Sequence, residues 1–301
     1  MDVDMVTLVA IGLLTGATTV LFGFGGGFVA VPVVVWADRA LGADAVRVAT
    51  ATSALVMVVG AAFATAVTPR RDLRALRGTG PLLALLAAGA CLGAGVARLA
   101  PPGLARWAFV GYVALTALDL LLRPGFLRPP AAGSRFGASS DGMEAGDHGG
   151  RRVPEPAADA TAGRPLPAPT GLPIGAVAAF LGVGGSVMTV PAMRRAGHPM
   201  RRATALANPL TLAIALPAAL VSLAGSPPLA APAAPVDLVG LIDPYAATAL
   251  LLGALPVIAL LRRRPPRIPD RAHAWTYIGL LSVVAVAMAL SDPVTHTGPT
   301  G

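Results

Sequence analysis

Gly-Phe-Gly-Gly-Gly-Phe-Val-Ala-Val-Pro, at residues 23–32, interrupts the first apolar run of this 301-residue chain and has a second copy. The copy is Gly-Val-Gly-Gly-Ser-Val-Met-Thr-Val-Pro, at residues 182–191, where three glycines, a valine and the final proline recur in register. Each copy is followed, past a short loop, by an Ala-Thr-Ala triplet, at residues 49–51 and 203–205. A register kept across loops of different length indicates two related halves.

Both copies are predicted to interrupt a helix. Each glycine in a helix interior costs about 1 kcal/mol relative to alanine. Pro32 and Pro191 each remove a backbone donor and crowd the preceding turn, so we expect them to break a helix. Inside a membrane, backbone freed in this way is tolerated only within protein or against a wet cavity. Its N–H groups, with those of the following half-helix, carry partial positive charge and suit an anion.

The candidate anion-binding residues join these glycines to polar side chains in the runs that follow. Hydroxyl, amide and backbone N–H donors can hold an oxyanion without a full positive charge. The alternative is that the glycines only allow close helix packing and that the polar side chains bond to helix carbonyls or cap helix ends. The candidates are Gly25, Gly26, Gly27, Gly184, Gly185, Ser186, Thr52, Ser53 and Asn208.

The composition is that of a membrane protein. Apolar residues make up 55% of the chain and charged residues 13%, and the mean hydropathy is +0.71. A soluble domain of this length would need far more charge to cover its surface. The runs long enough to matter predict an all-α polytopic membrane protein with about seven or eight hydrophobic segments. They cover residues 5–36, 46–67, 79–99, 104–122, 171–193, 203–224, 238–261 and 272–290.

The segments fall into two groups with a polar stretch between them. We expect a first transmembrane repeat over residues 1–122 and a second over 171–290. Residues 123–170, rich in Pro, Gly and Arg, read as a disordered linker outside the membrane, and 291–301 as a polar tail. No basic residue precedes the first run, so we keep it as mature structure instead of a signal peptide.

The basic residues report membrane topology. All 23 are arginine, and they cluster between apolar runs, which argues for the positive-inside rule and against nucleic-acid binding despite the net charge of +8. The most arginine-rich short loops lie near residues 69–77, 194–202 and 262–271. Eight simple spans would put the first of these opposite the other two. Antiparallel halves, each with a broken or re-entrant first run, would put all three on one side.

Few side chains could support catalysis. The single cysteine, Cys91, excludes disulfides within the chain and a multi-cysteine metal site, and we expect it to be a small buried packing residue. The runs contain no nucleophile and base set and no His/Glu metal ligands, so we predict no enzyme activity, metal or cofactor. Asp119 and Asp243 are expected at the membrane interface, and His198 at the surface of an arginine-flanked loop.

At these motifs the sequence resembles the TauE/SafE family, often called sulfite exporters. The resemblance rests on Gly-x-Gly-Gly-Gly-x-x-x-Val-Pro at residues 23–32, on its second copy, and on Ala-Thr-Ala-Thr-Ser-Ala-Leu at 49–55, which looks like the family's Thr-Ser element. It covers both apolar halves and not the linker. Ser186 replaces the third glycine, and Asn208 and Pro209 stand near the position of Thr52 and Ser53. The resemblance implies a transporter of sulfite, organosulfonates or related organic anions.

The leading hypothesis is therefore a multi-pass inner-membrane protein, a secondary transporter or facilitator that moves a small anion through the glycine-rich breaks. Its expected partners are the small anionic substrate and the lipid bilayer, with no nucleic acid, and a homo-oligomer is left open. The alternative is a membrane scaffold or assembly factor in which the glycine motifs only pack helices.

Overall fold

The computed structural model describes residues 5–76, 78–123, 126–127, 166–224 and 237–290. Throughout these ranges the regular elements are helices, apart from one isolated β-bridge between Val239 and Ile242. Seven helices are long and apolar enough to cross a membrane. They are α1 (Met5–Phe22), α3 (Ala45–Ala66), α5 (Gly80–Leu99), α6 (Pro102–Leu122), α9 (Met200–Leu223), α10 (Pro244–Arg263) and α11 (Asp270–Leu290). The predicted class, an all-α polytopic membrane protein, is confirmed.

The remaining helices are shorter. They are α2 (Gly27–Ala37), α4 (Arg70–Leu73), α7 (Gly171–Leu181) and α8 (Ser186–Arg195), with a 3-10 helix, η1 (Arg39–Asp44), after α2. The seventh apolar run was placed too early, because α10 begins only at Pro244, after the bridged turn that holds Val239 and Ile242. Most of the predicted linker, and the whole of the predicted tail, lie outside the described residues.

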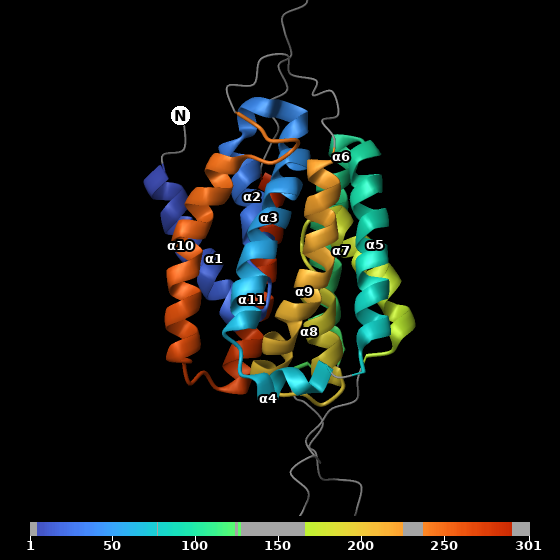
Figure 1. The fold of residues 1–301 in the computed structure, drawn as a ribbon, viewed down its shortest axis with the longest axis vertical. Coiled ribbons are helices and arrows are strands. Elements are labelled where there is room, and N and C mark those ends of the chain that lie inside the picture. Colours follow the sequence, from blue (N-terminus) through green and yellow to red (C-terminus); the bar gives the residue numbers. More distant parts are fainter. Residues whose placement is uncertain (1–4, 77, 124–125, 128–165, 225–236, 291–301) are drawn as a thin grey trace, which may run out of the picture.

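Each first run folds into two helices that meet inside the bundle. In Figure 1, α1 starts at the end where the N label lies, and α2 returns to that end, where η1 leads into α3. In the second half, α7 and α8 form the matching pair, which starts and finishes at the opposite end. Each pair therefore enters and leaves on one side, and the three long helices that follow supply the crossings.

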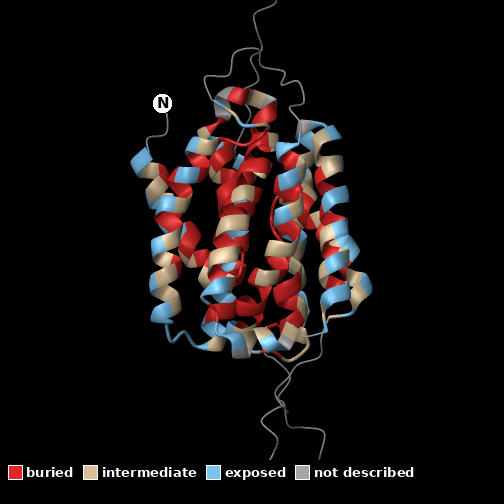
Figure 2. Ribbon diagram, viewed as in Figure 1, coloured by how far each residue is buried: buried red, intermediate tan, exposed pale blue. Residues whose placement is uncertain are grey.

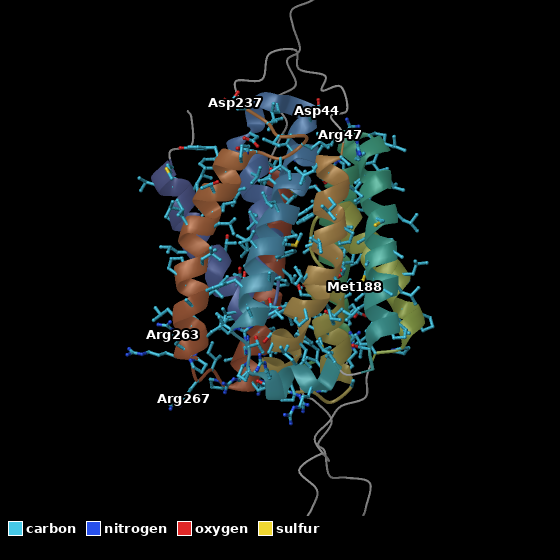
Figure 3. All side chains as sticks on the ribbon, viewed as in Figure 1. Asp44, Arg47, Met188, Asp237, Arg263 and Arg267 are labelled. Carbon is cyan, nitrogen blue, oxygen red and sulfur yellow. The ribbon has the colours of Figure 1, made fainter. Side chains whose placement is uncertain are left out.

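The two halves are consequently antiparallel, as the arginine distribution predicted. Arg194 forms an ion pair with Asp270, and Arg195 with Asp119, so the ends of α8 and α6 meet the start of α11. Arg262 lies within electrostatic range of Arg201 and Asp72, which belong to the other two arginine-rich loops. Figure 3 shows Arg263 and Arg267 at the end opposite Asp44 and Asp237. All three loops therefore share one end, called here the arginine end; the other is the acidic end.

The first helix of each half packs on the other half, through glycines. A Cβ on Gly12 of α1 would lie 2.4 Å from the carbonyl oxygen of Leu250 in α10. A Cβ on Gly93 of α5 would lie 2.0 Å from that of Ala176 in α7. Backbones can approach this closely only where a residue has no side chain. Such close packing is common between membrane helices, because lipid tails provide no hydrophobic driving force for their association.

The outer faces of the bundle are apolar, as lipid requires. Figure 2 shows exposed residues along the outer sides of the long helices and buried ones along the central helices. Leu92, Leu99 and Leu115 are among the large exposed apolar side chains. Cys91 is also exposed, so its prediction as a buried packing residue was wrong. The face of α5 that packs on α7 carries Gly93, and Cys91, two residues earlier, lies on the other side.

Candidate functional site

The helix breaks lie at the glycines. Between α1 and α2, Gly23, Gly25 and Gly26 have φ angles of 76°, 65° and 98°, and between α7 and α8, Gly182 and Gly184 have 68° and 69°. These left-handed conformations disfavour any residue with a Cβ, by roughly 1–2 kcal/mol each. The motif therefore needs glycine for its backbone path, whereas Gly12 and Gly93 serve only helix contact.

The helices are not broken at the prolines, so the prediction that Pro32 and Pro191 break a helix was wrong. Both lie inside a helix, Pro32 in α2 and Pro191 in α8, several residues after the breaks. A proline removes one hydrogen bond, and a buried membrane helix tolerates that loss when neighbouring groups support the freed carbonyl. A run of positive-φ glycines, in contrast, redirects the backbone itself.

The two glycine loops meet where α3 and α9 pack together. A Cβ on Gly25 would lie 2.9 Å from Thr211 Cγ2, and one on Gly184 would lie 3.0 Å from Met57 Sδ and 3.1 Å from Thr211 Cγ2. The same Cβ on Gly184 would lie 3.5 Å from the carbonyl oxygen of Phe24, in the other loop. Both loops are buried. Residues more than 150 positions apart in the sequence thus form one central site.

Two half-helices point their N-termini at this site from opposite directions. α2 starts at Gly27 and runs to the acidic end, whereas α8 starts at Ser186 and runs to the arginine end. The first N–H groups of any helix have no carbonyl to bind within that helix. Each terminus also carries about half a positive elementary charge from the helix dipole. Gly25 and Gly184 therefore sit between two donor-rich ends.

Unpaired polar side chains accompany the start of α8. Ser186 and Thr189 are buried, and within the described part of the chain neither hydroxyl oxygen has a hydrogen-bond partner. Asn208 on α9 is fully buried; its Nδ2 donates to the Thr204 carbonyl at 3.3 Å, and its Oδ1 is also without a partner there. Thr189 was not singled out from the sequence, although its spacing of three from Ser186 puts both on one helix face.

The other candidates have structural partners. The Thr52 hydroxyl accepts the Asp243 amide at 2.9 Å, next to the start of α10. The Ser53 hydroxyl donates to the Thr50 carbonyl at 2.9 Å and lies 3.3 Å from the Gly182 carbonyl, so it supports the second loop. A Cβ on Gly26 would meet Thr15 of α1, one on Gly27 Met57, and one on Gly185 Ile214.

The structure adds contacts of His198 and Asp243 that the sequence did not predict. His198 is only 5% exposed, so its placement at the surface was wrong: its loop folds over Arg194, whose Nη1 donates to the His198 carbonyl at 3.4 Å. Asp243, expected at the interface, caps α10 by accepting the Ala246 amide at 3.0 Å, and it is buried beside Asp38. No sequence signal linked the two aspartates, which are more than 200 residues apart.

Asp38 lies outside the membrane-spanning helices, between α2 and η1. Burial, and then the neighbouring Asp243 carboxylate, raise the pKa of Asp38 from 3.8 to about 7. Because the folded protein binds this proton more tightly than the unfolded chain, Asp38 favours the folded state fully below pH 4. That advantage is lost as the pH rises to about 7.

We therefore expect Asp38→Asn to raise the melting temperature of the detergent-purified protein at pH 8 and to leave it nearly unchanged at pH 5. The amide cannot ionise, so the variant avoids a buried charge beside Asp243. Thermal melts from pH 5 to pH 8 test this, with Asp237→Asn at the same end as control. A melting temperature that falls with pH equally in Asp38→Asn and wild type would contradict the assignment.

Antiparallel halves and half-helix N-termini at the centre of an all-α membrane protein are features that many transporter folds share. Residues 8–288 match the family model described as "Sulfite exporter TauE/SafE", and the chain belongs to this family. The sequence resemblance is thereby confirmed, and the protein is a membrane transport protein of this family. Comparison with curated proteins and with solved structures found no match.

Proposed function

We propose that this protein is a secondary transporter or facilitator that carries a small anion, such as sulfite or an organosulfonate, through the central site. The observation that supports this most is the convergence of two half-helix N-termini on Gly25 and Gly184, beside Ser186, whose hydroxyl has no hydrogen-bond partner among the described residues. Donors that face one point from opposite directions suit a compact oxyanion, which accepts hydrogen bonds on several oxygens.

The charge of the site favours a monoanion. The described atoms nearest the Cβ positions of Gly25 and Gly184 belong to Thr211, Ala61, Met57 and Phe24, none of which is charged. Two helix termini together supply about one positive elementary charge. A sulfonate or hydrogensulfite would be balanced by that charge, whereas a sulfate dianion would leave about one negative charge buried, at a cost of several kcal/mol.

Orientation and movement follow from the antiparallel halves. By the positive-inside rule the arginine end faces the cytoplasm of a cell with an inner membrane. Each half presents one hairpin, α1–α2 or α7–α8, from its own side, so rocking of one half against the other would expose the same site alternately to either side. The division into repeats at residues 1–122 and 171–290 is part of this proposal.

The scaffold alternative treats the motif glycines as packing residues. Gly12 and Gly93 fit that description, because their Cβ atoms would strike the backbone of a neighbouring helix. Gly25 and Gly184 instead have positive φ and face side chains of Met57 and Thr211. The two sets of glycines are therefore distinguishable by substitution.

We expect Gly184→Ala to lower anion uptake into proteoliposomes about tenfold while the folded yield is retained. A methyl group at φ 69° costs roughly 1–2 kcal/mol and would push the loop away from Met57 Sδ, moving the donors at the start of α8. The flux assay should include sulfite, methanesulfonate, sulfate and a carboxylate.

Gly197→Ala is the matched control. Gly197 also has a positive φ, 96°, but nothing lies within 4 Å of its Cβ position, so only the backbone strain is reproduced. Uptake near the wild-type level in Gly197→Ala with a large loss in Gly184→Ala supports the site. Equal uptake in the two variants, or a wild-type protein that moves none of the anions, favours the scaffold.

A further inference from the structure

A second feature suited to anions lies between the central site and the acidic end. A cavity of about 30 Å³ opens among α3, α5, α6, α7 and α9. That volume holds about two water molecules. Its lining includes Arg47, Thr50, Arg98, Phe180 and Ser222. Figure 3 shows Arg47 at the acidic end, near the label of Asp44.

Two guanidinium groups give this cavity its charge. Arg47, in the first turn of α3, places Nη1 3.3 Å from the Asp44 carboxylate and donates from Nη2 to the Ala100 carbonyl at 2.9 Å. Its Nε is buried and has no partner among the residues that the structure describes. Arg98, near the end of α5, donates from Nη1 to the Val221 carbonyl at 3.1 Å. Two cationic side chains thus line the cavity, and Arg47 forms an ion pair with the carboxylate of Asp44.

The inner side of the cavity lies beside the second glycine break. A Cβ on Gly182 would lie 2.9 Å from Thr50 Cγ2, and Thr50 lines the cavity. Phe180, two residues before Gly182, lines it as well, from the last turn of α7. An anion in the cavity would therefore lie beside Thr50, which contacts the start of the loop that leads to Gly184.

The repeat places a second arginine pair at the other end. Arg47 precedes the first Ala-Thr-Ala triplet by two residues, and Arg201 precedes the second triplet by two. Arg98 is the penultimate residue of α5, and Arg262 is the penultimate residue of α10, a helix of equal length. Arg262 lies within electrostatic range of Arg201, and its Nε and Nη2 are buried without a partner in the described chain. Each half of the protein therefore carries an arginine pair at equivalent positions.

We infer that Arg47 and Arg98 form an outer oxyanion-binding vestibule, which holds sulfite or the oxyanion group of a sulfonate before the anion enters or after it leaves the central site. The Arg201 and Arg262 pair takes the same place at the cytoplasmic end. Guanidinium groups bind sulfonate and sulfite oxygens through charge-assisted hydrogen bonds, and Arg47 and Arg98 both belong to the lining of the cavity. This inference rests on the proposed function for its role in transport, but binding at the vestibule can be measured without transport.

Thiol modification tests the vestibule directly. In a Cys91→Ala background, Ser222→Cys places a thiol in the cavity lining. Two methanethiosulfonate reagents are compared, one that carries an ethylsulfonate and one that carries an ethyltrimethylammonium group. We expect the sulfonate reagent to react about tenfold faster, and Arg98→Gln to remove that preference, because a charge-assisted hydrogen bond contributes about 1.5 kcal/mol or more. Arg98→Lys should retain part of it.

The control thiol is Val239→Cys, which is exposed at the same end and outside the cavity lining. Its reagent preference should not respond to Arg98→Gln. A preference at Ser222→Cys that survives Arg98→Gln overturns the vestibule, even if the protein transports sulfite. If Arg98→Gln removes the reagent preference and the protein also shows an anion flux that depends on Gly184, both proposals are supported. If Arg98→Gln removes the preference but the protein moves no anion, the vestibule stands and the transport proposal is overturned.

Discussion

Gly93→Ala will sharply lower the folded yield of this protein. The added Cβ would lie 2.0 Å from the carbonyl oxygen of Ala176 and 2.8 Å from its carbonyl carbon, and both are backbone atoms that cannot rotate away. α5 and α7 would have to separate, and overpacking of this kind costs roughly 1–3 kcal/mol or more. The measurement is the monodisperse fraction and the melting temperature in detergent.

The same helix supplies the control for this prediction. Gly95 is two residues further along α5, and nothing lies within 4 Å of its Cβ position. Gly95→Ala should keep or raise the melting temperature, because alanine is favoured over glycine in a helix by about 1 kcal/mol. Equal melting temperatures for Gly93→Ala and Gly95→Ala would show that α5 and α7 are not in contact in the folded protein.

Asp270→Asn will destabilise the arginine end by about 1–3 kcal/mol, because it leaves the fully buried Arg194 guanidinium without its carboxylate partner; the Asp270 side chain itself is 41% exposed, so the loss stays below that of a pair buried on both sides. Arg194 is fully buried, and its Nη1 lies 2.7 Å from Asp270 Oδ2, while its Nη2 donates to the Phe126 carbonyl at 2.8 Å. Without Asp270 the guanidinium keeps only carbonyl partners. The asparagine amide can still accept the Met200 N–H, as Asp270 Oδ1 does at 2.8 Å. The loss of stability in Asp270→Asn therefore measures the removed charge and not this hydrogen bond.

Asp119→Asn serves as the comparison, because its partners Arg195 and Arg123 are both partly exposed, whereas Arg194 is fully buried. Exposed pairs of this kind contribute about 0–1 kcal/mol. The double variant Arg194→Met/Asp270→Asn should recover part of the stability, since no buried charge remains. Thermal or denaturant unfolding in detergent distinguishes the cases. The account fails if Asp119→Asn costs as much as Asp270→Asn.

The main architecture was accessible from the sequence because it depends on local patterns. Span lengths, the glycine breaks and the antiparallel halves follow from hydropathy, from the repeat at residues 23–32 and 182–191, and from where arginine gathers. The sequence cannot tell a positive-φ glycine from a packing glycine, however, and so it did not distinguish Gly25 from Gly93. That difference appears only when two helices are brought together.

The errors came from contacts between distant segments. His198 is buried because Arg194 beneath it pairs with Asp270 on another helix. Thr52 looked available for substrate but accepts the amide of Asp243. Asp38 and Arg47 were overlooked because each lies next to a helix end. The pKa of Asp38 is raised by burial and by Asp243, and the cavity that Arg47 lines is completed by residues of other helices, all far away in the chain.

The exchange of first helices between the halves dictates an order of assembly during synthesis. α1 is synthesised before the other described helices, but its glycine face fits α10, which emerges more than 200 residues later, so α1 enters the membrane before this partner exists. Its polar side chains allow this, because Thr15, Thr18 and Thr19 all donate to carbonyls of α1 itself. α1 therefore precedes α10 in synthesis but can reach its native packing against α10 only after most of the described chain has been made.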